Sequence, residues 1–347
     1  MTVPFLDLRR ETEELRSELR AALEATLDES RFVHGEAVAA FERGFAEFCG
    51  ARHCVGVGSG TDALAIALRA AGVGPGDEVI TAANTCIPTV AGISASGATP
   101  VLADVDRHSL TLDASSVADA ISPRTRALMP VHLYGRRVEL GPLVTLAHEN
   151  GLRIVEDAAQ AHGVVDVVDV AAFSFYPTKN LGALGDAGAI VTSDADTAER
   201  ARLLREYGGG TERAGQSRLD TVQAAVLSVK LSHVPRWNAR RRELAAHYSD
   251  ALGGTPLGLP PEGPQAHHLY VVRSGERDAL RRRLSERGVE TLVHYDRAVH
   301  HHSAWAELAR PGLDESERAA AEVLSLPLYP QLTDDEAETV IEAVLSG

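Results

Sequence analysis

Lysine is almost absent from this chain, and its scarcity singles out one position. Of the 34 basic residues, only Lys179 and Lys230 are lysines, and the others are arginines. A bias that replaces lysine with arginine spares a lysine either by chance or where an amine that can lose its proton is needed. Arginine stays charged at any working pH, whereas a desolvated lysine can become a free amine and form a Schiff base. Lys179 is therefore either a reactive amine or an ordinary surface lysine.

Cysteine, long apolar runs and net positive charge are also scarce, and each absence excludes a class of protein. The three cysteines, Cys49, Cys54 and Cys86, are too few for a disulfide framework, which indicates a reducing cytosol. The amino-terminal segment is charged, unlike a signal peptide, and no apolar run reaches membrane-spanning length. The net charge of −15 argues against nucleic-acid binding. We expect a cytoplasmic protein without a membrane or nucleic-acid partner.

The segment around Lys179 has the pattern of two strands joined by a glycine-rich loop. The apolar run Val170–Phe175 predicts a strand, and Ala189–Thr192 predicts the next one. Between them, Gly182, Gly185 and Gly188 would allow the backbone to approach a flat ligand closely. This setting favours the reactive amine over the surface lysine.

A second small-residue turn, Gly58–Thr61, lies between a predicted strand, His53–Val57, and a predicted helix, Asp62–Ala71. Free N–H groups and the positive end of the helix dipole make such a turn a seat for a phosphate. The glycines also resemble a dinucleotide fingerprint, but the acidic residue that this motif needs after the next strand is missing. A single phosphate is favoured over a nicotinamide nucleotide, and a helix cap without a ligand remains the other interpretation.

Beyond this turn, apolar runs with strand and helix patterns alternate, which predicts an α/β fold with a mostly parallel sheet between helices. The length of 347 residues indicates a large domain with a smaller one, or a single large α/β unit. Ligands of such sheets bind beyond the carboxyl ends of the strands.

One acidic pair follows a predicted buried strand, Leu152–Val155, at the ligand-binding edge of the sheet. The pair is Glu156 and Asp157, and Asp157 lies 22 residues before Lys179. A carboxylate at a strand end is often only a cap for the following turn. Together with Lys179, however, it suits pyridoxal phosphate, which needs a lysine for its aldehyde and an aspartate for its pyridine nitrogen.

The run His300–His302 suggests metal ligands, but three adjacent side chains on regular structure cannot all face one ion. We therefore predict no metal site there.

Several long motifs in order, "GSGTDAL", "HLYG", "EDAAQAHG", "SFYPTKNLGALGD" and "SRLDTVQAAVL", resemble the DegT/DnrJ/EryC1/StrS sugar aminotransferases. The likeness extends over essentially the full chain. It implies a fold type I pyridoxal-phosphate enzyme, with a large cofactor-binding domain over residues 1–235 and a small α/β domain over residues 236–347. It also implies pyridoxal 5′-phosphate (or its amine form) as cofactor and a homodimer with sites at the subunit interface.

The resemblance assigns roles to particular residues. Lys179 would form the Schiff base and move protons, and Asp157 would pair with the pyridine nitrogen. The expected cofactor-binding residues are Gly60, Thr61, Cys86, Asp157, Gln160, Ser174 and Lys179. The expected substrate-facing residues are Tyr134, Tyr176, His294 and Tyr295, although the last three could equally be packing residues.

Within the family, the "FYPTKNLGALGD" motif is most similar to enzymes that aminate thymidine-diphosphate-linked 3-keto-6-deoxyhexoses in amino-sugar and antibiotic biosynthesis. The implied donor is an amino acid, L-glutamate. A cyclitol or 4-keto-sugar aminotransferase is the alternative within the class. A non-catalytic cofactor-binding paralogue and a nicotinamide-dependent sugar oxidoreductase are alternatives from other classes.

The chain departs from the family pattern at three places. Cys86 stands where many relatives have an aromatic ring that stacks on the cofactor. The segments after His162 and after Tyr207 are shorter than usual, and Gln216 replaces an asparagine in the second one. These changes leave the expected cross-subunit contact and the substrate range open.

Overall fold

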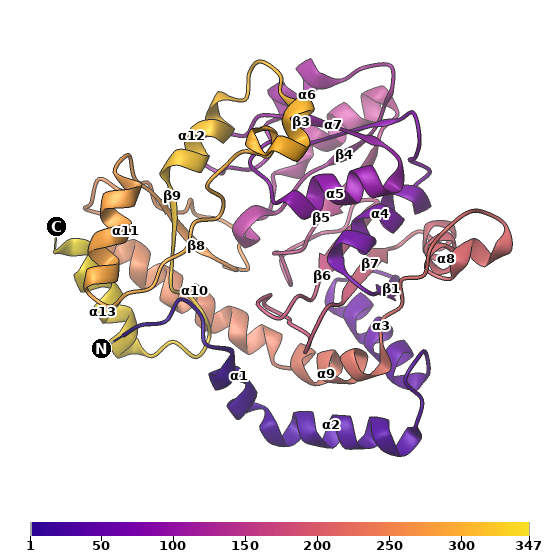
Figure 1. Cartoon of the computed structure of the whole chain (residues 1–347), viewed down its shortest axis with the longest axis horizontal. Helices are drawn as coiled ribbons and strands as arrows, with labels where there is room; N and C mark the ends of the chain where they lie inside the picture. The colour runs from indigo at the N-terminus through magenta and orange to yellow at the C-terminus, as the bar shows by residue number, and fades with distance from the viewer. Residues whose placement is uncertain (1, 347) are drawn as a thin grey trace.

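A seven-stranded sheet forms the centre of the computed structural model, which describes residues 2–346 (Figure 1). The strand order is β1-β7-β6-β5-β4-β2-β3, and only β7 runs antiparallel to its neighbours. The strands are β1 His53–Val57, β2 Glu78–Ala82, β3 Thr99–Ala103, β4 Thr125–Met129, β5 Arg153–Asp157, β6 Val170–Ser174 and β7 Gly188–Thr192. This confirms the predicted α/β fold with a mostly parallel sheet.

Helices cover both faces of the sheet because consecutive strand residues point to opposite sides. In β7, Ile190 packs in the core with α4 and α8, whereas Ala189 and Val191 pack with α3 and α9 on the other face. Strands with two covered faces need continuous apolar runs, and their sequences have them. The helices of this part are α1 Leu8–Glu14, α2 Arg16–Glu29, α3 Glu36–Phe48, α4 Gly60–Ala70, α5 Ile87–Ser96, α6 Ala114–Ala120, α7 Leu140–Asn150, α8 Ala195–Leu204 and α9 Thr221–Leu231.

A smaller two-stranded sheet lies in the carboxyl-terminal part of the chain. Its antiparallel strands are β8 Tyr270–Arg273 and β9 Val323–Leu326, and the helices around it are α10 Val234–Leu252, α11 Arg277–Glu286, α12 Asp314–Glu322 and α13 Asp334–Leu345. The early residues of α10, such as Trp237, pack with the large sheet, whereas Tyr248 and Leu252 pack with the small one. We propose that the two predicted domains, 1–235 and 236–347, are joined through this helix.

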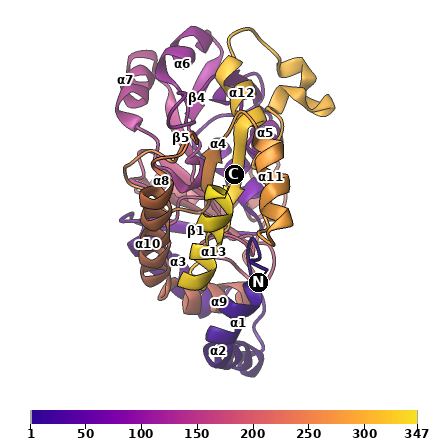
Figure 2. The same ribbon diagram turned by 90° about the vertical axis from the view of Figure 1, so that its left-hand side faces the viewer.

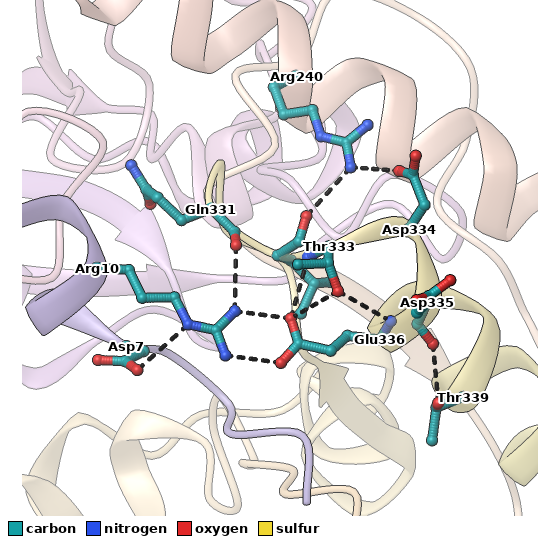
Figure 3. A network of polar contacts seen from close by, with 10 residues as sticks. Asp7, Arg10, Arg240, Gln331, Thr333, Asp334, Asp335, Glu336 and Thr339 are labelled. Atoms are coloured by element: carbon teal, nitrogen blue, oxygen red, sulfur yellow. Dashed lines mark hydrogen bonds and ion pairs between the residues drawn. The ribbon is translucent and has the colours of Figure 1, made fainter. Parts of the chain in front are cut away.

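The amino-terminal segment crosses to the carboxyl-terminal part, and Figure 2 shows both marked termini on that face of the molecule. Val3 pairs with Val289 in a short parallel bridge and is fully buried in the smaller core. Arg10 then forms a bidentate ion pair with Glu336, with both N–O distances at 2.7 Å (Figure 3). Thr333 and Glu336 also form the capping box at the start of α13.

Because Glu336 serves both the ion pair and the cap, we expect Glu336→Gln to lower the free energy of unfolding by about 2 kcal/mol at neutral pH. The Arg10 guanidinium holds the pKa of Glu336 at about 2, below its ordinary value of 4.5. A depressed carboxyl pKa contributes stability above pH 4.5 that is lost as the pH falls toward 2. Chemical denaturation of both proteins between pH 7 and pH 3 should show the gap closing, and a constant gap would contradict this account.

Two differences from the predicted elements have clear causes. The apolar spacing of Glu11–Leu27 predicts one helix, but the structure breaks it at Leu15, whose side chain is buried and whose N–H closes the end of α1. The apolar pattern of "VETLVHY" predicts a strand, and this prediction is wrong, since the segment makes only single bridge contacts with the amino terminus and β9. Within residues 2–346, no helix has the length and apolar character needed to cross a membrane.

Candidate active site

The carboxyl ends of the parallel strands surround a cavity of about 340 Å³. Strand β5 ends in Asp157, β6 leads to Lys179, and β1 leads to the amino terminus of α4 at Gly60. The cavity brings together nearly all of the predicted site residues: Gly60, Thr61, Cys86, Asp157, Gln160, Ser174, Tyr176, Lys179 and Tyr295. Tyr134 and His294 are not among its lining residues. Residues far apart in the sequence therefore form one pocket at the edge where parallel sheets bind ligands.

One end of the cavity is built for an anion. Ser59 caps α4 by accepting a hydrogen bond from the Asp62 N–H at 3.1 Å. The N–H groups of Gly60 and Thr61 belong to the first turn and have no acceptor within the helix. A Cβ atom on Gly60 would lie 2.5 Å from the Cβ of Ser174, so only glycine allows the serine to approach. Backbone donors, the helix dipole and the Ser174 hydroxyl together suit a phosphate group.

Asp157 is buried beneath the cavity and held in one orientation. Thr89 donates a hydrogen bond to its Oδ2 at 2.8 Å, and the Ala159 N–H donates to its Oδ1 at 3.1 Å. Burial raises the pKa of Asp157, and these two donors and Lys179 partly offset that effect. A desolvated carboxylate of this kind gains from a cationic N–H placed against it. Asp157 therefore fits the ring nitrogen of a pyridine cofactor.

Lys179 faces the same cavity from the loop after β6. Desolvation lowers the pKa of its ammonium group, and the negative charge of Asp157 partly opposes this. A lowered pKa increases the fraction of neutral amine near pH 7, which is the form that attacks a carbonyl. Asn180 anchors the loop by donating hydrogen bonds to Asn238 Oδ1 and the Ala266 carbonyl at 3.0 and 2.8 Å.

The expectation that Gly182, Gly185 and Gly188 would line the ligand site is wrong, because none of them borders the cavity. A Cβ on Gly182 would lie 2.4 Å from the Pro177 carbonyl oxygen, and one on Gly188 would lie 2.3 Å from the Ser59 carbonyl oxygen. These glycines allow the loop to fold tightly on itself and against the start of α4.

Gln160 links the cavity wall to the segment behind it. Its Nε2 donates to the Tyr295 hydroxyl at 3.2 Å, and its Oε1 accepts from the Tyr134 N–H at 2.5 Å. Tyr134 itself is 1% exposed, and its hydroxyl donates to the His294 carbonyl. The structure therefore places Tyr134 behind the site, where it supports His294 and Tyr295.

Cys86 also lines the cavity and lies close to Tyr295. Burial raises the pKa of the Cys86 thiol, which keeps it neutral. A small thiol covers less of a flat ring than an aromatic side chain would.

The sequence interpretation missed two supporting contacts. His132 accepts a hydrogen bond at Nδ1 from the Val138 N–H, so its Nε2 carries the proton and donates to Glu156 at 2.9 Å. This fully buried pair joins the ends of β4 and β5 beside Asp157. Thr89 was also missed. The position of His132 in "HLYG" was a visible signal, whereas nothing in the sequence pairs Thr89 with Asp157.

A second cavity of about 590 Å³ adjoins the first through neighbouring residues. It is lined by Thr178 and His294, whose chain neighbours Lys179 and Tyr295 line the first cavity. Arg281 and Arg241 also border it. An arginine run on a helix predicts a solvated face for Arg240–Arg242, but the structure buries Arg241, whose Nη1 donates to three backbone carbonyls.

In the structure, part of the run His300–His302 lies beside an acidic residue. Two of its members, His300 and His301, approach Glu317 of α12, with nitrogen–oxygen distances of 2.9 and 3.4 Å. Metal-bound histidines nearly always hydrogen bond through their other ring nitrogen. The buried Nδ1 of His300 has no such partner within residues 2–346. The cluster is explained by hydrogen bonds to Glu317, and we assign no metal to it.

The residues present fit pyridoxal phosphate at three separate points: an anion seat at α4, a buried carboxylate and a desolvated lysine. By fold, the chain is similar to DesV from Streptomyces venezuelae, whose structure was solved in complex with a ketimine intermediate. It has a TM-score of 0.96 and 48% identity and covers 99% of this chain and 97% of its own. NtdA from Bacillus subtilis, solved with bound cofactor PMP, has a TM-score of 0.94 and 30% identity and covers 99% and 84%.

Fold and site together define an aminotransferase of the pyridoxal-phosphate-dependent fold type I class. The profile of the DegT/DnrJ/EryC1/StrS aminotransferase family matches residues 13–345, and the chain belongs to this family. A dTDP-3-amino-3,4,6-trideoxy-alpha-D-glucose transaminase from Streptomyces venezuelae is 48% identical over 360 residues, which span 99% of this chain and 95% of the relative.

Proposed function

We propose that this enzyme uses pyridoxal phosphate to transfer an amino group from L-glutamate to the keto group of a dTDP-3-keto-6-deoxyhexose. The observation that carries the proposal is the convergence of Lys179, Asp157 and the α4 amino terminus on one cavity. The 48% identity to a dTDP-amino-sugar transaminase supports the substrate class. The absence of an acidic residue after β2 disfavours a nicotinamide enzyme, since β2 ends in Ala82 and is followed by Ala83 and Asn84.

When bound, pyridoxal phosphate supplies an aldehyde and an electron-withdrawing ring. Gly60, Thr61 and Ser174 would hold its phosphate, and Asp157 would accept the hydrogen bond of its pyridine N–H. Lys179 would bind the aldehyde and then, as a free amine, take a proton from the donor's α-carbon and return one to the cofactor. The lowered pKa of Lys179 supports this second role, because a base must be neutral to accept a proton.

The second cavity is the proposed seat for the nucleotide part of the substrate. It adjoins the cofactor cavity, and its volume of about 590 Å³ is within the usual range for a ligand site. Its arginines supply positive charge for a diphosphate, although the chain as a whole carries −15. Within this proposal, the sugar ketone would point through the His294–Tyr295 boundary toward Lys179.

Arg281→Gln is therefore expected to raise KM for the nucleotide sugar about 10-fold, because one guanidinium contact to phosphate is lost. The value of kcat and the half-reaction with glutamate should stay near wild type. Arg282→Gln is the matched control, since Arg282 is exposed on the same helix and does not border the cavity. Steady-state kinetics with the nucleotide sugar measure both. Equal KM values for Arg281→Gln and Arg282→Gln would show that the second cavity does not bind the substrate.

We further propose a homodimer in which the partner covers the cavity mouth. Tyr176 and Leu184, which flank Lys179 in the chain, are 53% and 48% exposed in the single subunit. Apolar side chains beside a catalytic pocket are a common feature of an interface. Leu184→Asp is expected to shift the protein from dimer to monomer in analytical ultracentrifugation, whereas Leu203→Asp, at a similarly exposed leucine on α8, should not. A monomeric wild type would contradict the dimer.

A further inference from the structure

A third cavity, of about 540 Å³, lies between the large sheet and the smaller carboxyl-terminal sheet. We call it the arginine cleft, after Arg107, Arg136, Arg273 and Arg318, which line it together with Leu110 and Leu259. These residues come from the loop after β3, the turn after β4, strand β8 and helix α12, and from the segment before β8. The cleft shares no lining residue with either of the two cavities described above.

Arg136 is the unusual residue of the cleft. Its side chain is only 5% exposed, yet no carboxylate of residues 2–346 lies within ion-pair distance of it. Its Nη1 donates to the Ser109 carbonyl at 2.7 Å, and its Nε is buried without a partner. A guanidinium has five N–H donors and stays charged, so burying one without a counter-ion is unfavourable. Burial and the neighbouring Arg273 lower the pKa of Arg136 to about 10, consistent with an unmatched charge.

The remaining charges of the cleft leave it positive. Arg273 pairs with Glu322 at 2.7 Å, and Arg318 pairs with Glu315 at 2.7 Å, so these two are neutralised. Arg107 is exposed and has no ion pair in the described part of the chain.

The acidic residue of the same loop does not offset this charge directly. Asp106 Oδ1 accepts the N–H groups of His108 and Ser109 at 2.9 and 2.7 Å, which occupies that oxygen within the loop. His108 adds a titratable group that is neutral or positive. Two guanidinium groups, those of Arg107 and Arg136, therefore remain without a carboxylate partner.

We propose that the arginine cleft binds a small organic phosphate, distinct from the cofactor and from the sugar substrate. Two unpaired guanidinium groups match the double negative charge of a phosphate ester, which arginine recognises through paired N–H donors. Leu110, Leu259 and Val271 line the rest of the cleft and suit the apolar or ring portion of such a ligand. Inorganic phosphate alone would leave this surface uncovered.

The cleft is also connected to the active site by direct contacts. The Arg136 guanidinium lies 5.3 Å from the centre of the Tyr134 ring, in cation–π contact. The Tyr134 hydroxyl donates to the carbonyl of His294, which is bonded to the cavity residue Tyr295. A ligand bound to Arg136 would therefore lie next to Tyr134, which supports the substrate-facing residues His294 and Tyr295.

The test is isothermal titration of the full-length, cofactor-saturated protein with phenyl phosphate, a phosphate ester that has an apolar ring and no nucleoside for the second cavity. Wild type is expected to bind phenyl phosphate at one cleft site, with about 10-fold weaker binding in Arg107→Gln and none in Arg136→Gln. Arg281→Gln is the control for the nucleotide seat, and it should leave this binding unchanged. Lys179→Ala should also bind normally, so failure of the proposed transamination would not affect the result.

Several outcomes would overturn the proposal. Absence of binding to wild type would do so, as would binding that is lost in Arg281→Gln but kept in Arg136→Gln, since the ligand would then lie in the second cavity. Arg136→Met separates a binding role from a structural one. If Arg136 serves to bind a ligand, Arg136→Met without ligand should unfold at the same temperature as wild type or at a higher one. The added phosphate ester should not raise the unfolding temperature of this variant. If Arg136→Met unfolds at a lower temperature than wild type, and the added phosphate ester changes the unfolding temperature of neither protein, then Arg136 has a structural role.

Discussion

Lys179→Ala is expected to lower the transaminase rate constant by at least about 10⁴-fold, the largest effect of any single substitution in this chain. The amine would bind the cofactor aldehyde and would also move the proton at the substrate carbon, and no other side chain in the cavity offers a second amine. Tyr295 and Cys86 are the nearest alternatives, but burial raises both of their pKa values, so neither is a base near neutral pH. Single-turnover kinetics with saturating cofactor measure the effect.

The other lysine of the chain is the natural control. Lys230 is buried in α9, where its Nζ donates to Glu11 Oε1 at 2.6 Å, and it does not line the active-site cavity. Lys230→Arg keeps the charge and should leave the rate within about 2-fold of wild type. Residual activity of Lys179→Ala above about one per cent would show that Lys179 is not the proton-transferring group.

The second large effect is expected at Asp157, where substitution by asparagine should lower the rate constant by roughly 10³-fold. An amide cannot hold a proton on the pyridine nitrogen, so the ring would withdraw fewer electrons when the substrate carbon loses its proton. Binding of the cofactor should weaken less than the rate, because the phosphate seat at α4 is untouched. Fluorescence titration of the cofactor and single-turnover kinetics separate the two quantities.

A graded variant tests whether the charge of Asp157 is what matters. Thr89→Val removes the hydroxyl that donates to Asp157 Oδ2, and it keeps the side-chain shape. Loss of one hydrogen bond to a charged group should reduce the rate about 10-fold, with the effect growing as the pH falls and Asp157 becomes protonated. Equal rates for Asp157→Asn and wild type would remove this residue from the mechanism.

Much of the large sheet was predictable because its strands are buried on both faces and read as continuous apolar runs. The sequence pattern predicts the strand His53–Val57 and the helices Glu36–Phe48, Leu140–Asn150 and Thr221–Leu231, and β1, α3, α7 and α9 have these bounds. The apolar run "RALMPVHLYG" predicts one strand as far as Gly135, whereas β4 stops at Met129. Pro130 follows directly, and proline lacks the N–H that a central strand needs, so the chain turns there.

The site residues could be predicted from the sequence where the order of the strands fixes their position, and could not be predicted elsewhere. Asp157 ends β5 and Lys179 follows β6, so parallel topology places them at one edge. The arginine cleft, by contrast, brings Arg107 and Arg136 together with residues of β8 and α12 from much later in the chain. Likewise, the bond between Arg10 and Glu336 joins residues at opposite ends of the chain, and no periodic pattern reports such a pair.

The most direct test of the central claim is the absorption spectrum of the purified protein with pyridoxal phosphate, before and after L-glutamate, in wild type and in Lys179→Ala. Wild type should show a visible band that needs Lys179, and glutamate should bleach it while one equivalent of 2-oxoglutarate appears. Adding a dTDP-3-keto-6-deoxyhexose should then restore the band. If no lysine-dependent band forms, or if glutamate leaves it unchanged, the cavity does not perform transamination, and the chain is a non-catalytic member of its family.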